Sequence, residues 1–181
     1  MRPENSSHAP LDLKGSIVDV LDHPAPGVIF RDISPMIGDA QRFDHVLTRL
    51  VEWAAPLEPD IVAAVDARGF IFGGALAAAL KCGFVPLRKQ GKLPRARLSV
   101  EFDSEYSTET LEVHTDAFAP GARVLFHDDV IAVGNCSSGS IELLERLGAE
   151  VVGACFLVEL KRLNGRHKLT GREVFSVVQY D

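Results

Sequence analysis

Three short segments of the sequence combine charged side chains with glycine next to apolar runs. The first is Asp66-Ala-Arg-Gly69, which follows the continuous apolar run 61–65. Gly69 permits a tight turn, a helix beginning after it would offer unpaired backbone N–H groups, and Arg68 adds a fixed positive charge. This combination suits the binding of a phosphate or pyrophosphate group. The alternative is a surface arginine in a connecting loop.

The second segment is basic. It contains Arg88, Lys89 and Lys92 around Gly91, directly after the apolar run 84–87. Three cations this close together can neutralise a highly charged anion. Their concentration is informative because the chain as a whole carries a net charge of −6. The alternative is a solvated basic loop.

The third segment carries two adjacent carboxylates, Asp128 and Asp129, after the predicted strand 123–127, whose centre is apolar. A turn rich in Gly, Asn and Ser follows and opens a predicted helix. The carboxylates can accept hydrogen bonds from ribose hydroxyls and face Mg²⁺, and the turn can bind a phosphate through backbone N–H groups. The alternative is an acidic pair at a strand end before a serine-capped helix. We favour a binding role, because carboxylates against a buried strand are costly without one.

The elements that must position these segments alternate between strands and helices. Runs of mainly apolar residues predict buried strands at 61–65, 84–87, 123–127 and 151–158, with a final strand at 174–178. Helical spacing or alanine-rich composition predicts helices at 11–22, 41–55, 70–80 and 138–147. This order predicts an α/β fold with a central, mostly parallel sheet flanked by helices. Ligands bind beyond the carboxyl ends of parallel strands, so the three segments are expected at one edge of the sheet.

Two regions lie outside this alternation. Residues 98–102 and 110–114 alternate apolar and polar side chains and predict an antiparallel hairpin with a flexible tip. Residues 1–10 are polar and are expected to be flexible. The length of 181 residues predicts one domain over 1–181.

Composition limits the class of function. The chain has 19 Lys and Arg against 25 Asp and Glu, whereas a general nucleic-acid binder usually has a basic excess. No apolar run approaches the roughly 18 residues of a membrane helix, and the N-terminus lacks the apolar core of a signal peptide. Cys82, Cys136 and Cys155 form no CxxC pair, which argues against a disulfide framework or a thiolate zinc site. We therefore expect a cytoplasmic protein that binds neither nucleic acid nor membrane.

Together, in this order and spacing, the three segments resemble those of the type I phosphoribosyltransferases. The resemblance extends over residues 24–180. The further matching segments are 26–35, 105–106, 157–160, 163–166 and 175–180. The resemblance implies that family's α/β fold, with the hairpin region 95–115 acting as a flexible hood over the site.

The resemblance also implies an activity. The most similar members of the family transfer phosphoribose from phosphoribosyl pyrophosphate to adenine, which gives AMP and pyrophosphate in purine salvage. It implies Mg²⁺ bound mainly through phosphoribosyl pyrophosphate, without direct protein ligands, and a homodimer. Two alternatives stay open: a catalytically weak relative that binds a purine or nucleotide as a sensor or partner protein, and a phosphoribosyltransferase with another base specificity. An NAD-dependent oxidoreductase is disfavoured because no G-x-G-x-x-G opens a helix after a predicted strand.

Site roles follow from the resemblance by position. The adenine pocket corresponds to Ile29, Phe30 and Arg31, and the pyrophosphate-binding groups to Ala67, Arg68, Arg88, Lys89 and Lys92. The catalytic carboxylates correspond to Glu105, Asp128 and Asp129, and Tyr106 belongs with Glu105 to the hood. The 5′-phosphate loop corresponds to Ala132, Val133, Gly134, Asn135, Cys136 and Ser137.

The 5′-phosphate loop departs from the family pattern. The family has Ala-Thr-Gly-Gly-Thr where this chain has Ala132-Val-Gly-Asn-Cys136, so both threonine hydroxyls are absent. A hydrogen bond to a charged group contributes about 1.5–3 kcal/mol. The backbone N–H groups are unaffected by these substitutions, and Ser137 and Ser138 are nearby donors. The loop is therefore either remodelled and competent or weakened.

Overall fold

The computed structural model of the protein describes residues 11–103 and 108–181. Its internal contacts divide the chain into two compact units, Met1–Val46 and Leu47–Asp181, and each is described by itself. The helix α2 (Ala40–Ala54) begins in the first unit and continues in the second. The expectation of one domain over 1–181 stays a prediction.

The first unit contains a two-stranded antiparallel sheet. Strand β1 (Val18–Leu21) pairs with β2 (Ile29–Asp32), and the short helix α1 (Ser34–Ile37) follows. The predicted helix over 11–22 is wrong: this segment forms a 3-10 turn, Lys14–Ser16, and then β1. Val18 and Val20 are β-branched and favour a strand. Pairing with β2 provides hydrogen bonds for the backbone of β1, and this outweighs the weak helical periodicity of the segment.

The second unit contains a seven-stranded sheet in the order β5-β6-β4-β3-β7-β8-β9. Its strands are β3 (Ile61–Val65), β4 (Gly83–Lys89), β5 (Arg97–Asp103), β6 (Thr108–His114), β7 (Arg123–Ile131), β8 (Glu150–Leu160) and β9 (Val174–Tyr180). The strands β4, β3, β7, β8 and β9 run parallel to one another. Strands β5 and β6 form the predicted antiparallel hairpin at one end of the sheet. The α/β prediction with a mostly parallel sheet is confirmed.

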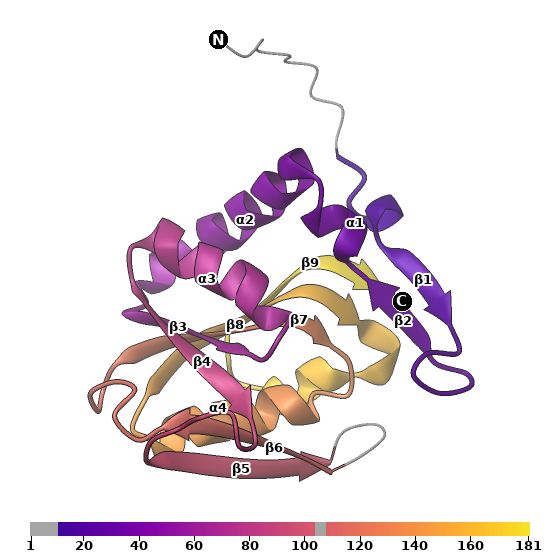
Figure 1. The fold of residues 1–181 in the computed structure, drawn as a ribbon. Helices are drawn as coiled ribbons and strands as arrows, with labels where there is room; N and C mark the ends of the chain where they lie inside the picture. Colours follow the sequence, from indigo (N-terminus) through magenta and orange to yellow (C-terminus); the bar gives the residue numbers. More distant parts are fainter. Residues whose placement is uncertain (1–10, 104–107) are drawn as a thin grey trace, which may run out of the picture. The chain divides into compact units, whose positions relative to one another are not determined.

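Helices cover both faces of this sheet. Helix α3 (Gly69–Leu80) lies on one face and α4 (Asn135–Arg146) on the other (Figure 1). The main core cluster joins α4 and the strands, with Phe126, Phe156 and Leu144 fully buried. The second part of α2 packs on β9, where the rings of Trp53 and Phe175 stack with their centroids 5.4 Å apart. These layers hold the ends of β3, β4 and β7 in fixed positions.

The structure moves two predicted boundaries near the acidic pair. Strand β7 extends to Ile131 rather than stopping at 127, and α4 begins at Asn135 rather than at 138. Asp128 and Asp129 therefore lie inside a strand, and only residues 132–134 connect strand to helix. The charges of the acidic pair suggested a strand end, but β8 continues the ladder through Asp128, whose register partner is Phe156.

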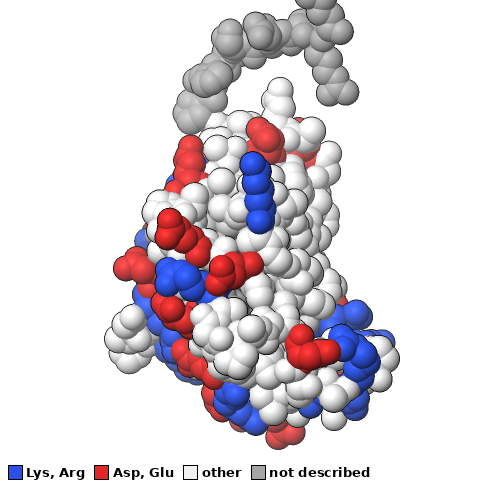
Figure 2. All heavy atoms as spheres, turned by 90° about the vertical axis from the view of Figure 1, so that its left-hand side faces the viewer, with Lys and Arg blue, Asp and Glu red and all other residues white. Residues whose placement is uncertain are grey.

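The surface shows no single dominant charge on the face in Figure 2. There, acidic and basic side chains are intermixed, with uncharged surface between them. Separately, none of the helices formed by the described residues is long and apolar enough to cross a membrane.

Candidate active site

The turn after β3 joins the first two sequence segments. The backbone N–H of Asp66 donates to the carbonyl of Leu87 at 2.9 Å, and the side chain of Asp66 accepts from Nε of Arg88 at 2.8 Å. The guanidinium of Arg88 also lies over the ring of Phe70, 5.9 Å from its centroid. The Asp66–Ala67 peptide bond is cis. The turn and the basic loop therefore form one structure at the carboxyl ends of β3 and β4.

The same turn contacts the acidic pair. Nε of Arg68 lies 2.7 Å from Oδ2 of Asp129, and a Cβ added to Gly69 would lie 3.0 Å from Oδ1 of Asp128. Only glycine fits this approach without displacing the carboxylate. The first and third segments thus meet as predicted.

Burial dominates the electrostatics of the acidic pair. The side chains of Asp128 and Asp129 are buried, and Oδ1 of Asp128 accepts the backbone N–H of Asp129 at 2.9 Å. Burial raises the pKa of Asp128 well above its usual value, and repulsion from Asp129 raises that pKa further. Burial also raises the pKa of Asp129, while the positive charge of Arg68 opposes the shift. A ligand that donates hydrogen bonds, such as a sugar diol, would stabilise the charged forms of these carboxylates.

Acidic side chains of β6 hold the basic loop. Nζ of Lys89 lies 3.0 Å from Oε2 of Glu109, and the backbone N–H of Gly91 donates to Oε2 of Glu112 at 3.0 Å. Glu112 is buried and also accepts from Nε of Arg97 at 2.9 Å. Lys92 is exposed in the turn after β4. Sequence reasoning did not single out Glu112, although its place in an alternating strand beside a basic loop was a usable signal.

The segment matched to the 5′-phosphate loop forms a tight strand-to-helix turn. Gly134 precedes the first residue of α4 with φ of +81°, a left-handed conformation that favours glycine. The first N–H groups of a helix lack partners within the helix and attract anions. Cys136 places Sγ 3.8 Å from Oδ2 of Asp128, and burial raises the pKa of its thiol well above the usual value. Ser137 is buried. Its role as a donor to the phosphate stays a prediction.

The segment after β8 packs on this turn. A Cβ on Gly134 would lie 2.5 Å from the carbonyl oxygen of Gly165, and a Cβ on Gly165 would lie 2.2 Å from that of Ala132. The two backbones therefore touch, which requires glycine on both sides. Sequence reasoning matched 163–166 to the family but assigned it no role; the glycine within it was the available signal.

The residues matched to the adenine pocket lie in the first unit. Ile29, Phe30 and Arg31 belong to β2. The ring of Phe30 meets His23 edge-on at 5.2 Å between centroids, and Arg31 forms an ion pair with Asp19. Their role in base binding stays a prediction. Glu105 and Tyr106 lie outside the described residues.

Across residues 11–103 and 108–181, no cluster of three or more His, Cys, Asp or Glu side chains is arranged to hold a metal ion.

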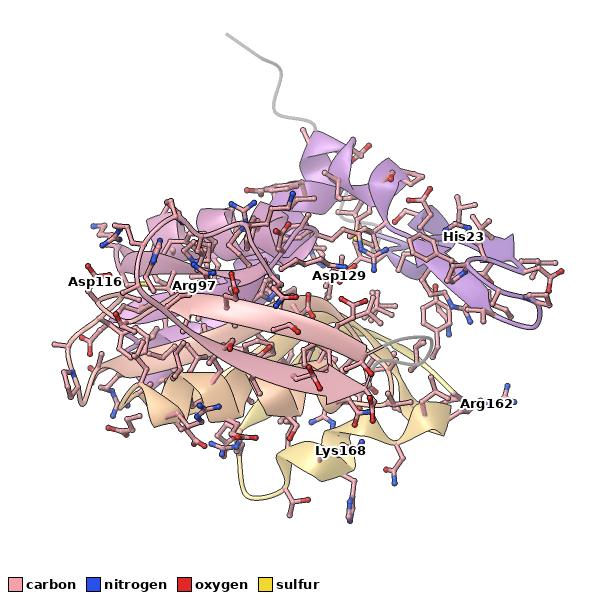
Figure 3. The ribbon with its side chains drawn as sticks, turned by 60° about the horizontal axis from the view of Figure 1, so that its bottom comes forward. His23, Arg97, Asp116, Asp129, Arg162 and Lys168 are labelled. Carbon is pink, nitrogen blue, oxygen red and sulfur yellow. The ribbon has the colours of Figure 1, made fainter. Side chains whose placement is uncertain are left out.

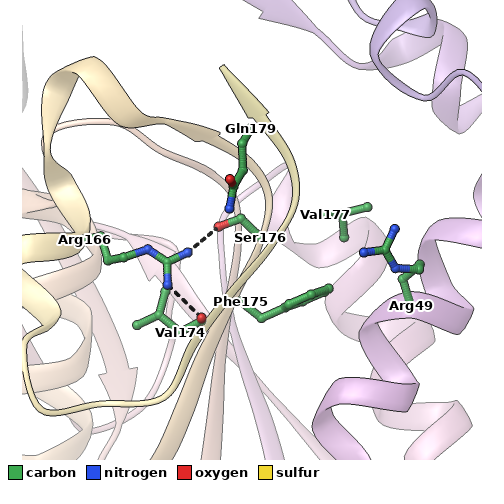
Figure 4. A pocket seen from close by; sticks show the side chains of 7 residues that line it. All are labelled: Arg49, Arg166, Val174, Phe175, Ser176, Val177 and Gln179. Carbon is green, nitrogen blue, oxygen red and sulfur yellow. Dashed lines mark hydrogen bonds between the residues drawn. The ribbon is translucent and has the colours of Figure 1, made fainter. Parts of the chain in front are cut away.

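A surface cavity of about 530 Å³ lies along β9, and none of the three segments lines it. Its lining residues are Arg49, Arg166, Val174, Phe175, Ser176, Val177 and Gln179 (Figure 4). Arg166 is held there by Glu159, with Nε to Oε1 at 2.9 Å, and by the carbonyl of Val174 at 2.8 Å.

Comparison with known proteins gives one consistent result. Residues 36–180 match the family model described as the phosphoribosyl transferase domain. The chain is 50% identical to an adenine phosphoribosyltransferase of Carboxydothermus hydrogenoformans over 94% of its own length and 100% of the relative's.

Solved structures agree with this match. A crystal structure of adenine phosphoribosyltransferase from Thermoanaerobacter pseudethanolicus is 42% identical with a TM-score of 0.90, covering 93% of this chain and 98% of that one. The enzyme from Giardia lamblia, crystallised with 9-deazaadenine, is 34% identical with a TM-score of 0.90, covering 94% of this chain and 97% of that one.

Proposed function

Because the chain belongs to the adenine phosphoribosyltransferases of the phosphoribosyltransferase family, we propose that the site at the carboxyl ends of its parallel strands catalyses their reaction. In this reaction phosphoribose is transferred from phosphoribosyl pyrophosphate to adenine, which gives AMP and pyrophosphate. The observation that carries this assignment of the site is the pairing of Arg68 with Asp129 at 2.7 Å. It places a cation suited to pyrophosphate beside carboxylates suited to a ribose.

The chemistry of the transfer explains why both charges are needed. The bond between ribose C1′ and a pyrophosphate oxygen breaks, and the electron pair leaves with the oxygen. A bond from adenine N9 to C1′ forms, and N9 loses its proton. The ribose becomes cationic in the transition state while the pyrophosphate gains negative charge, so acids near the sugar and cations near the leaving group stabilise both.

Each matched residue has a proposed role in this reaction. Asp128 and Asp129 accept hydrogen bonds from the ribose hydroxyls. The pyrophosphate is bound by the turn and the basic loop through Ala67, Arg68, Arg88, Lys89 and Lys92. In that complex Lys89 exchanges Glu109, 3.0 Å away, for the ligand.

The remaining roles also stay proposals. The adenine is bound by Ile29, Phe30 and Arg31, the 5′-phosphate by residues 132–137, and the hood residues Glu105 and Tyr106 exclude water during the reaction. We also propose a homodimer and a cytoplasmic location, which suits the three free cysteines.

Magnesium is proposed to bind with the substrate. The oxygen donors of Asp128 and Asp129 have the chemistry that Mg²⁺ prefers, but the described residues offer no third acidic ligand beside them. An ion held mainly by phosphoribosyl pyrophosphate fits this donor set. It would neutralise part of the charge of the pyrophosphate.

Turnover of radiolabelled adenine by the purified protein tests the function. AMP should form only when phosphoribosyl pyrophosphate and Mg²⁺ are both present. Hypoxanthine and guanine, offered in parallel, test base specificity. No AMP under these conditions, or faster use of another base, would overturn the proposal.

A further inference from the structure

A lysine from outside the predicted site reaches the start of α4. Nζ of Lys168 donates to the side-chain oxygen of Asn135, the first residue of that helix. The amide nitrogen of the same Asn135 donates to the carbonyl of Asp103 at 2.7 Å, where β5 ends. Figure 3 shows Lys168 on the segment that follows β8. One asparagine side chain therefore connects the end of β5, the phosphate loop and an ammonium group.

The backbone fixes this arrangement. Lys168 belongs to a 3-10 helix, Gly165–Leu169, whose first residue touches Ala132 and Gly134 of the loop. The residue after the lysine, Leu169, is buried in the core cluster with Ile141 of α4. Both ends of this short helix are thus attached to the loop or to α4, and Lys168 starts from a defined position.

The loop itself has lost donors at this point. Val133 and Cys136 replace threonine, and the thiol of Cys136 is directed to Asp128 at 3.8 Å. An ammonium group has three N–H donors, of which Asn135 uses one. The nearby acid Glu145 is already paired with Arg172 at 2.8 Å. Lys168 therefore places a charged donor with spare N–H groups at the start of α4.

We propose that Lys168 binds the 5′-phosphate of the substrate and that Asn135 is the positioning residue that holds it there. The inference rests on the proposed function, which makes residues 132–137 the 5′-phosphate site. In this chain a charged contact thus takes over from the two absent threonine hydroxyls. The ammonium and the phosphate carry opposite charges, so their hydrogen bond is charge-assisted and offsets part of the loss of the two hydroxyl donors.

Calorimetric titration with ribose 5-phosphate tests the proposal without adenine or pyrophosphate. Lys168→Met should weaken binding by about tenfold or more, and Lys168→Arg should recover most of the loss. The dependence of affinity on salt should become shallower in Lys168→Met. Asn135→Ala should weaken binding less, and adding Lys168→Met to it should cost less than in the wild-type protein.

A matched control is Lys161→Met, which also removes one exposed lysine from the second unit; Lys161 lies 3.5 Å from Asp181. This variant should bind ribose 5-phosphate like the wild type. In steady-state assays, Lys168→Met should raise KM for phosphoribosyl pyrophosphate and leave KM for adenine unchanged. Wild-type affinity in Lys168→Met, equal losses in both lysine variants, or no binding by the wild type would overturn the inference. An enzyme that binds ribose 5-phosphate but never converts adenine would instead refute the proposed function.

Discussion

Nε of Arg68 lies 2.7 Å from Oδ2 of Asp129, although Arg68 lies in the turn after β3 and Asp129 lies within β7. The arginine side chain is partly exposed, at 42%, whereas the aspartate side chain is 8% exposed. The ion pair therefore has one solvated partner and one buried partner. A ligand can reach the guanidinium while the carboxylate stays fixed beneath it.

Arg68→Ala should impair the use of phosphoribosyl pyrophosphate and leave adenine use nearly unchanged. The substitution removes a cation from the pyrophosphate side and leaves the buried carboxylate of Asp129 unpaired. We expect KM for phosphoribosyl pyrophosphate to rise by roughly tenfold or more, since a hydrogen bond to a charged group contributes about 1.5–3 kcal/mol. Steady-state kinetics with each substrate varied in turn provide the measurement. Equal losses for the two substrates would contradict the placement.

Asp128→Asn should stabilise the ligand-free protein while reducing its activity. Burial raises the pKa of Asp128, so the folded state keeps a proton that the unfolded chain releases. The stability from this source is complete below the unfolded pKa of about 4 and is lost as the pH rises toward the folded value. The asparagine avoids that loss, and its advantage in Tm should grow as the pH rises above about 4, by roughly 2–4 °C for each kcal/mol.

Thermal unfolding at several pH values measures this effect. Asp116→Asn is the control, because Asp116 is exposed and its ion pair with Arg95 lowers its pKa. It should give no Tm gain that grows with pH. A Tm of Asp128→Asn equal to or below the wild-type value throughout the range would refute the prediction.

Gly134→Ala should lower the free energy of unfolding more than Gly171→Ala does. Both glycines have a left-handed backbone, with φ of +81° and +85°. A Cβ at Gly134 would lie 2.5 Å from the carbonyl oxygen of Gly165, whereas a Cβ at Gly171 would meet nothing within 4 Å. Strain alone costs roughly 1–2 kcal/mol at either position, and the clash adds to it only at Gly134. Urea unfolding of both variants compares the costs; equal destabilisation would count against the close approach.

Val133→Thr combined with Cys136→Thr should strengthen the binding of AMP and phosphoribosyl pyrophosphate. Each restored hydroxyl can contribute more than about 1 kcal/mol to a charged phosphate, so a gain of roughly tenfold is expected. Asn135 is left in place because it holds Lys168. Adenine binding should hardly change. Calorimetric titration with AMP is the measurement, and no gain would mean that the present loop is already competent.

Much of the second unit was predictable from the sequence. Strand β3 has the predicted bounds 61–65, and the strands β4, β8 and β9 differ from prediction mainly by extension at their ends. Continuous apolar runs mark strands buried on both faces, and that signal is local. Strand β1 was missed because its pairing with β2, rather than its own periodicity, decides its conformation.

Residue type and spacing alone identify the groups of the proposed site: two carboxylates, a basic loop, and a glycine turn without the two threonines. Tertiary structure decided how they combine. Arg68 meets Asp129, Asp66 meets Arg88, and Lys168 meets Asn135 only because parallel strands bring their carboxyl ends to one edge. The last of these pairs is separated by 33 positions along the chain, so no local pattern reports it. Contacts of this kind depend on the packing of whole elements, whereas residue type and spacing are properties of the sequence alone.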